Sequence, residues 1–437
     1  MLKQDTIYAL ATPNGRSAVA VFRISGKNCI KIIKKITLLK KIEANKSINT
    51  SIYLDKKNKE ILDNGVITFF KKPKSYTGED ILEIGVHGGF SIISDFIKLI
   101  NKTNLCRIAN RGEFTRRAFE NNKMDLTQAE AVIDLVNAET SKQRVLAINQ
   151  LRGKLGNKIF DWEKKIKNIL ANVEAIIDFS EEDIPDNLNK TLKEQTKNII
   201  EELKKFIDDN MHGERIRNGY RISILGKPNV GKSSLINHLA KRDISIVSNI
   251  PGTTRDIIEL NYDFEGFPLI FYDTAGLRKT RKKIEKIGIN KAIENSINSE
   301  INLIIIEKIK EIDEYKRKFD NIIFVQSKVD KNIRIKDSRV FKISSKNGSG
   351  IYNVLLNIKK NILKKTENRE NIYVSRERHR RIIEDSLENL EKSVKINDIE
   401  IVAEEIRQSL KNLSKITGRN DIEDILDIIF NDFCIGK

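Results

Sequence analysis

The period of hydrophobic and polar positions changes three times along the chain. Residues 1–118 hold short apolar runs separated by turns, at 18–24, 65–70 and 81–86, and this spacing predicts strands. A stretch with a helical period, Ser91 to Ile100, follows Gly88 and Gly89. Strands mixed with a helix over this length predict a compact α+β domain.

A helical period dominates the next segment, from about 125 to 210. Apolar residues recur there at helical spacing, at Leu126, Ala129, Ile133 and Val136. Thr127 and Glu130 have the spacing of a capping box, which predicts a helix start. After Pro185 the period resumes from Leu192 to Ile207, and it returns over 376–432.

Between the two helical segments, alternating apolar runs predict an α/β unit. Its strand candidates are 221–225, 267–272, 302–306, 322–326 and 340–344. We expect this unit to be inserted into a helical domain, because insertion is tolerated where the host chain lies at the surface. The predicted domains are 1–120 (α+β), 121–214 (helical, first part), 215–370 (α/β) and 371–437 (helical, second part).

The start of the α/β unit carries a phosphate-binding pattern. Gly226 to Ser233 follow the apolar run 221–225 and match G-x-x-x-x-G-K-[ST]. The glycines let successive backbone N–H groups point at one anion at the start of a helix. Lys232 would bind the β- and γ-phosphates, and Ser233 would bind Mg²⁺.

Two later segments fit the same chemistry. Gly252 to Asp256 read Gly-Thr-Thr-Arg-Asp, where a switch segment with a magnesium-binding Thr is expected, and Asp273 to Gly276 end the apolar run 269–272. The order of these features predicts a GTPase.

The guanine-reading segment departs from the usual Asn-Lys-x-Asp, because residues 327–330 read Ser-Lys-Val-Asp. Asp330 can still accept from the guanine N1–H and 2-amino groups. Ser327 is shorter than Asn and cannot reproduce its amide contacts, so we expect weaker affinity with specificity largely retained.

Composition narrows the class of protein without deciding its partner. The 437 residues are 39% hydrophobic, three cysteines are scattered, and no apolar run approaches membrane-spanning length, so we expect a soluble protein of a reducing cytoplasm. The net charge of +18 favours a nucleic-acid partner. Because Lys and Ile crowd the whole chain, drift toward A/T-rich codons explains the charge equally well.

Longer strings outside the nucleotide motifs are more specific. They lie at 5–7, 11–13, 15–16, 21–26, 76–80, 87–89, 112–119, 123–131 and 433–437, the last reading Phe-Cys-Ile-Gly-Lys. Through these strings the chain resembles, from end to end, the MnmE (TrmE) family of bacterial tRNA-modification GTPases. The resemblance implies a multidomain fold, with an α+β folate-binding domain, a split α-helical domain and an inserted α/β Ras-like P-loop GTPase domain.

The resemblance also implies partners and a reaction. Family members are cytoplasmic homodimers joined through their N-terminal domains, and they form a heterotetramer with the flavoprotein MnmG (GidA). Together these proteins add a (carboxymethyl)aminomethyl group to carbon 5 of the wobble uridine of certain tRNAs. No membrane is involved.

A folate site is implied at four positions. Arg23, Glu83, Lys123 and Lys437 match residues that contact 5-formyl- or methylene-tetrahydrofolate in the family. Glu83 could instead be a solvated strand residue, but its neighbours are apolar and an unpartnered buried carboxylate would be costly. Nothing near Cys434 marks its thiol as activated, so we do not predict that it is catalytic.

Hydrolysis needs a water-positioning group, and Leu277 occupies the position of the usual Gln. The resemblance assigns this role to Glu285. It implies Mg²⁺ at Ser233 and Thr254, with Asp273 acting through water, and K⁺ at Asn229, Ser248, Ile250 and Thr253. The GTP-binding residues that it implies are Asn229, Val230, Gly231, Lys232, Ser233, Ser234, Ser248, Asn249, Ile250, Pro251, Gly252, Thr253, Thr254, Asp273, Thr274, Ala275, Gly276, Lys328, Asp330, Ser344, Ser345 and Lys346.

Two other functions fit part of the pattern. A ribosome-assembly GTPase shares the P-loop and switch strings, but residues 1–131 argue against it. A scaffold that binds GTP without hydrolysing it would explain Leu277 and Ser327. The residues expected for hydrolysis are retained and argue against that alternative; they are Lys232, Ser233, Thr254, Asp273 and Glu285.

Overall fold

The computed structural model describes residues 5–178, 186–241, 258–273, 299–330, 335–363, 373–419 and 423–437. The chain forms two compact units, one of residues up to Ile133 together with Ser414–Lys437, and one of Asp134–Leu413. The predicted fold class is confirmed, because α+β, helical and α/β parts are all present. The predicted domain boundaries stay predictions.

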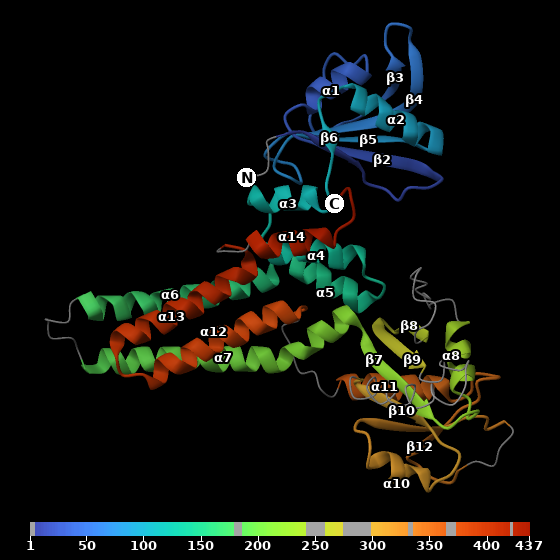
Figure 1. The fold of residues 1–437 in the computed structure, drawn as a ribbon, viewed down its shortest axis with the longest axis vertical. Coiled ribbons are helices and arrows are strands. Elements are labelled where there is room, and N and C mark those ends of the chain that lie inside the picture. The colour runs from blue at the N-terminus through green and yellow to red at the C-terminus, as the bar shows by residue number, and fades with distance from the viewer. Residues whose placement is uncertain are drawn as a thin grey trace, which may run out of the picture. The chain divides into compact units, whose positions relative to one another are not determined.

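The first unit is built on a six-stranded sheet of order β3-β4-β5-β2-β1-β6 (Figure 1). Its pairs are antiparallel except β1–β6. The strands are β1 (Ile7–Leu10), β2 (Ser17–Ser25), β3 (Ser47–Asp55), β4 (Glu60–Phe70), β5 (Ile81–Gly88) and β6 (Arg107–Ile108). Helices α1 (Cys29–Ile36) and α2 (Phe90–Lys102) share a hydrophobic core with the sheet.

Alternation along the strands decides which side chains leave this core. Phe22 and Ile24 of β2 and Ile84 of β5 are buried in it, and the Phe22 ring stacks on Phe96 of α2 at 4.2 Å. Because successive strand residues point to opposite faces, Arg23 and Glu83 lie on the other face of the sheet.

Helices that lie wholly or mostly in this unit also include α3 (Glu113–Glu120), α4 (Leu126–Val136) and α14 (Glu423–Asn431). The predicted capping box of Thr127 and Glu130 is wrong. Asp125 and Gln128 form the box instead, each backbone N–H donating to the other side chain at 2.9 Å. The Thr127 hydroxyl donates to Asp125 at 2.6 Å, so the carboxylate displaced Thr as the cap.

The second unit contains long helices that run alongside one another (Figure 1). They are α6 (Lys154–Asp178), α7 (Asp186–Asn218), α12 (Glu377–Lys395) and α13 (Ile399–Thr417), preceded by the shorter α5 (Ser141–Leu151). Trp162 of α6 is fully buried against Phe206 of α7, with ring centroids 4.9 Å apart. In the described residues, no helix combines the length and hydropathy needed to cross a membrane.

A second six-stranded sheet, of order β12-β11-β10-β7-β9-β8, forms the rest of this unit. The strands are β7 (Tyr220–Gly226), β8 (Ile258–Phe264), β9 (Phe267–Asp273), β10 (Ile301–Ile305), β11 (Ile322–Gln326) and β12 (Val340–Lys342). All pairs are parallel except β8–β9. Alternate residues of these strands belong to two hydrophobic clusters. One cluster also contains residues of α8 (Lys232–Ala240) and α11 (Ile351–Leu363), and the other contains residues of α10 (Glu311–Lys316).

This topology positions the candidate site. β7 lies between β10 and β9, and the parallel strands all end at the same edge of the sheet. Loops that follow such strands line the crevice where ligands bind in open α/β sheets. The phosphate-binding pattern follows β7, and the guanine-reading pattern follows β11.

Candidate functional site

The loop between β7 and α8 can be formed only with glycine at its two ends. Gly226 has φ 142° and Gly231 φ 112°. A Cβ on Gly226 would lie 2.4 Å from the carbonyl oxygen of Ile305, and one on Gly231 would lie 2.6 Å from Oγ of Ser327. These two positions bring the loop back to the first turn of α8, whose N–H groups face an anion site.

Lys232 is the buried cation of this loop. Its side chain is 7% exposed, and Nζ donates to the carbonyl oxygens of Gly226 at 2.6 Å and Lys227 at 2.8 Å. The ammonium group is therefore held across the loop that would surround the phosphates. Ser233 and Ser234 follow it on the first turn of α8 and are exposed.

The end of β11 is tied to the phosphate loop by two side chains. The Ser327 hydroxyl donates to the carbonyl oxygen of Val230, and the Lys328 ammonium donates to that of Asn229. Ser327 is thus buried against the loop, although it is shorter than the usual Asn. Sequence reasoning missed this contact, because it considered only the contacts that an Asn amide makes.

The residues predicted to read the base come together at the loop after β12. The Ser344 hydroxyl donates to Oδ1 of Asp330 at 2.8 Å, while the Asp330 side chain is exposed. The carbonyl oxygen of Ser345 accepts a hydrogen bond of 2.8 Å from Nδ1 of His238. His238 lies on α8, and no motif in the sequence pointed to it.

Several predicted residues lie outside the described residues. They are Ser248, Asn249, Ile250, Pro251, Gly252, Thr253, Thr254, Thr274, Ala275, Gly276 and Glu285. Asp273 ends β9, but its side chain is not among those described. The roles of these residues in the metal sites and in hydrolysis stay predictions.

A second cluster lies in the first unit, where Arg23 of β2 and Glu83 of β5 are direct cross-strand partners. The Arg23 guanidinium donates to Oε1 of Glu83 at 2.8 and 2.9 Å and to the Gly436 carbonyl oxygen at 3.4 Å. It also lies 5.5 Å from the ring of Tyr76 and 5.9 Å from that of Phe114. Through this last hydrogen bond, Gly436 near the end of the chain is held against β2.

Glu83 is not the unpartnered buried carboxylate that its apolar neighbours in the sequence suggest. The Glu83 side chain is 31% exposed and is paired with Arg23, so the carboxylate has a partner in the protein. Both hydrogen bonds from Arg23 end on Oε1. The need for a ligand therefore does not follow from desolvation.

The two predicted lysines are placed differently. Nζ of Lys123 donates to the carbonyl oxygen of Pro73 at 2.9 Å, and its stem packs against Gly78. The backbone N–H of Lys437 donates to Cys434 at 3.4 Å. Gly436, at φ 102°, passes so close to β1 that a Cβ would lie 2.7 Å from the Leu10 carbonyl oxygen.

A buried ion network, which sequence reasoning also missed, supports the loop that carries Tyr76. Arg117 is 4% exposed and bonds Asp5, Glu79 and Glu113 at 2.8–3.0 Å. Burial alone would raise the pKa of the Glu113 carboxyl, but hydrogen bonds from Arg107, the Asn110 backbone and Arg117 hold that pKa below its usual value.

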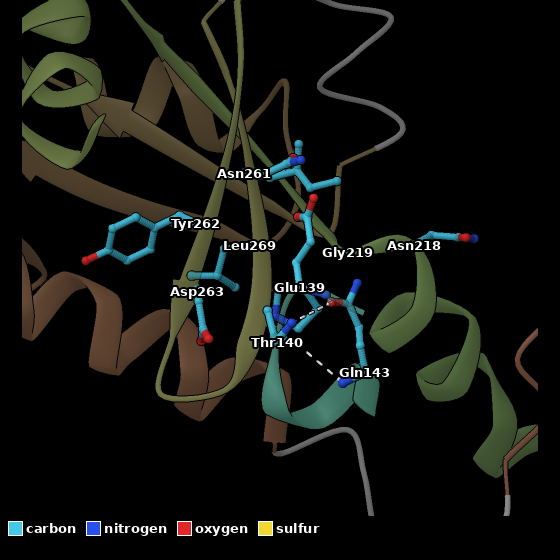
Figure 2. Close-up of a pocket in the computed structure, with 11 residues that line it drawn as sticks. Glu139, Thr140, Gln143, Asn218, Gly219, Asn261, Tyr262, Asp263 and Leu269 are labelled. Carbon is cyan, nitrogen blue, oxygen red and sulfur yellow. Dashed lines mark hydrogen bonds between the residues drawn. The ribbon is translucent and has the colours of Figure 1, made fainter. Parts of the chain in front are cut away.

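A separate polar hollow of about 100 Å³ lies between the start of α5 and the β8–β9 hairpin (Figure 2). Thr140 and Gln143 cap α5 there, and the Lys142 N–H donates to Gly266 in the hairpin turn at 3.1 Å. None of the nucleotide-motif residues that the structure describes lines this hollow. It is therefore a junction between helix and hairpin rather than part of the nucleotide site.

A strand, a glycine-ended loop and a helix lie at the edge of a parallel sheet, with a lysine across the loop, and the aspartate predicted to read the base lies after β11. These features define a P-loop GTPase domain. Comparisons with known proteins identify the rest of the chain. Residues 6–123 match the GTP-binding protein TrmE N-terminus, and residues 126–434 match the MnmE helical domain.

Curated relatives match over the whole length. The chain is 41% identical to the tRNA modification GTPase MnmE of Pelagibacter ubique (strain HTCC1062), 38% to that of Rickettsia typhi (strain ATCC VR-144 / Wilmington) and 37% to that of Rickettsia akari (strain Hartford). Each match covers 99% of this chain and 100% of the relative. The chain therefore belongs to the MnmE (TrmE) family of tRNA modification GTPases.

Solved structures also match part of the chain. The G domain of the T. maritima FeoB iron transporter is 21% identical, with a TM-score of 0.26, and the match covers 33% of this chain and 98% of that one. The FeoB G domain of Methanococcus jannaschii is 18% identical, with a TM-score of 0.25, 33% of this chain and 97% of that one being covered. Scores this low carry no argument about function.

Proposed function

We propose that this chain is a potassium-dependent GTPase that acts with a flavoprotein partner and a tetrahydrofolate one-carbon donor. Its product is a (carboxymethyl)aminomethyl group on carbon 5 of the wobble uridine of certain tRNAs. The observation that carries the proposal is the Arg23–Glu83 pair, which contacts the carbonyl of Gly436 in a chain that also holds a P-loop. Membership of the family supports both the folate part and the GTPase part of this proposal.

The folate half rests on the chemistry of this pair. Because Arg23 uses only Oε1 of Glu83, Oε2 can accept the paired N–H donors of a pterin edge. The rings of Tyr76 and Phe114 beside Arg23 offer aromatic surface for a flat heterocycle. Lys123 and Lys437 would supply cations for the glutamate tail of 5-formyl- or methylene-tetrahydrofolate.

The GTPase half rests on the P-loop. Ser233 is exposed directly after Lys232, where a hydroxyl fits a Mg²⁺ ligand, with Thr254 completing the set. Asn229 would hold K⁺ together with Ser248, Ile250 and Thr253. The two cations neutralise charge that develops on the phosphates when bound. Glu285 would position the attacking water, since Leu277 cannot.

Partners follow from the family and from charge. We propose a homodimer that assembles with MnmG (GidA) into a heterotetramer and works on tRNA in the cytoplasm. The net charge of +18 supports a polyanionic partner.

The deciding test combines cells and purified protein. Cells lacking the protein should lose the modified wobble nucleoside in mass spectra of digested tRNA, and the wild-type gene should restore it. Glu83→Gln keeps an oxygen that can accept from Arg23 but loses the carboxylate, so it should abolish binding of 5-formyl-tetrahydrofolate and leave GTP hydrolysis unchanged. Unaltered wobble nucleosides in the deletion strain would refute the proposal.

If the nucleosides are lost but Glu83→Gln binds folate normally, only the folate assignment is wrong. Asp63→Asn is the matched control, because Asp63 lies on the same sheet and pairs with His87, away from Arg23. It should leave folate binding intact.

A further inference from the structure

We propose that His238 is a positioning residue for guanine recognition, because it orients the peptide groups that would donate to O6 of the base. The inference rests on the proposed function only in that GTP is the ligand. It concerns a residue outside the nucleotide motifs, on the face of α8 that approaches the loop after β12.

The hydrogen bond defines the state of the His238 ring. Nδ1 lies 2.8 Å from the carbonyl oxygen of Ser345, and a carbonyl only accepts, so Nδ1 must carry the proton. Nε2 is buried and has no hydrogen-bond partner among the described residues. Within the described residues, the ring therefore makes one hydrogen bond and leaves a buried ring nitrogen unpaired, which is costly.

With that contact, the carbonyl oxygens of two successive peptide groups both accept hydrogen bonds, which fixes the orientation of both groups. The carbonyl of Ser344 accepts from the Gly348 N–H at 2.8 Å, and the carbonyl of Ser345 accepts from His238. In a trans peptide the C=O and N–H point in opposite directions. The N–H groups of Ser345 and Lys346 are thereby turned away from Gly348 and His238, and within the described chain neither donates a backbone hydrogen bond.

These two donors stand beside the acceptor that reads the other side of guanine. Ser344, which precedes them, holds Oδ1 of Asp330 at 2.8 Å. Guanine presents an acceptor at O6 and donors at N1 and the 2-amino group, which matches backbone donors next to a carboxylate. Adenine has an amino group at position 6, so it would face the two N–H groups with a donor.

His238 also connects base reading to phosphate binding. Its helix, α8, begins at Lys232, and the loop before it is tied to the end of β11 through Ser327 and Lys328. Guanine and phosphates are therefore read by parts of one hydrogen-bonded assembly, which holds the donors at a set distance from the P-loop.

The test is a ratio of affinities measured on the same protein. Purified full-length wild type, His238→Phe and His238→Gln are titrated with a fluorescent GDP, and GDP, 6-thio-GDP and IDP compete for the site. Replacing O6 by sulfur weakens only the acceptor that the backbone N–H groups would read. IDP lacks only the 2-amino group, which Asp330 would read.

In the wild type, GDP should bind more tightly than 6-thio-GDP. His238→Phe keeps the ring volume but has no donor, so GDP affinity should fall roughly five- to tenfold and the GDP/6-thio-GDP ratio should approach one. The GDP/IDP ratio should not change. His238→Gln can still donate from its amide and should keep most of both ratios.

Failures of the two proposals are distinguishable. A wild type that binds no GDP refutes the GTPase function itself. If GDP binds and the GDP/6-thio-GDP ratio is the same in wild type and His238→Phe, the positioning role is wrong. Should His238→Phe not fold, His238→Leu is measured in its place, and an unchanged ratio there refutes the role equally.

Discussion

Replacing Gly231 by alanine tests whether the P-loop geometry is required for nucleotide binding. Gly231 has φ 112°, a conformation that costs an L-residue about 1–2 kcal/mol. Its new Cβ would lie 2.6 Å from Oγ of Ser327, so the hydroxyl must leave the Val230 carbonyl oxygen. Losing that hydrogen bond costs about 1 kcal/mol more. The expected total is about 2–3 kcal/mol.

This cost is divided between two measurements. If the loop keeps its native form, the free energy of unfolding falls; if the loop relaxes, nucleotide must restore it and affinity falls instead. Urea unfolding and fluorescent GDP binding are therefore measured together, and the two losses should sum to about 2–3 kcal/mol. If all of it appears in binding, GDP affinity falls roughly 30- to 150-fold.

Gly266→Ala is the matched control. Gly266, in the β8–β9 turn, has φ 87°, but its Cβ would meet Ser141 at an ordinary 3.4 Å. The control should show the backbone cost alone, with normal GDP affinity. If Gly231→Ala resembles it in both measurements, the reasoning about the contact between Ser327 and the P-loop is refuted.

Four further outcomes are expected. Glu285→Ala should slow GTP hydrolysis by orders of magnitude with little change in GTP affinity, and near-normal turnover would remove Glu285 from the mechanism. Hydrolysis should be faster in potassium than in sodium chloride, and equal rates would contradict the potassium site. Ser327→Ala should lower GDP affinity roughly fivefold, because it removes the hydroxyl that donates to the P-loop. Unchanged GDP affinity would show that this hydrogen bond does not contribute to nucleotide binding. The pKa of Glu113 is held below its ordinary value in the folded state, so the carboxylate stabilises the fold above the unfolded pKa of about 4.3. This stabilisation is lost as the pH falls from that value through the lower pKa of the folded state. The urea midpoint of Glu113→Gln should therefore depend less on pH between about 3 and 5 than that of wild type.

Local chemistry made the P-loop readable from sequence. Its glycines, Lys232 and Ser233 all lie within Gly226–Ser233, and Lys232 Nζ donates to two carbonyl oxygens of that same segment, so their spacing in sequence reflects the geometry of the loop. The strands β7 and β9 were found for a related reason, since apolar residues predominate in both, although β7 also contains Arg221 and Ser223. The strand β8 was missed, although Leu260, Tyr262 and Phe264 alternate with polar residues, which is the pattern typical of an edge strand.

Competition between neighbouring residues limited what sequence could decide at helix ends. Thr127 and Glu130 have the capping-box spacing, and so do Asp125 and Gln128. Two overlapping boxes cannot both cap one helix. In the structure the Asp125 carboxylate and the Gln128 side chain form the capping hydrogen bonds.

Sequence alone therefore determined the class of each segment and the phosphate-binding loop, because helical periods, strand alternation and that loop depend on residues close in the chain. Only the tertiary structure decided the contacts between distant residues. Sheet register placed Glu83 opposite Arg23, and the approach of α8 to the loop after β12 placed His238 on the carbonyl of Ser345. Such contacts depend on how strands pair and helices pack, which no local spacing records.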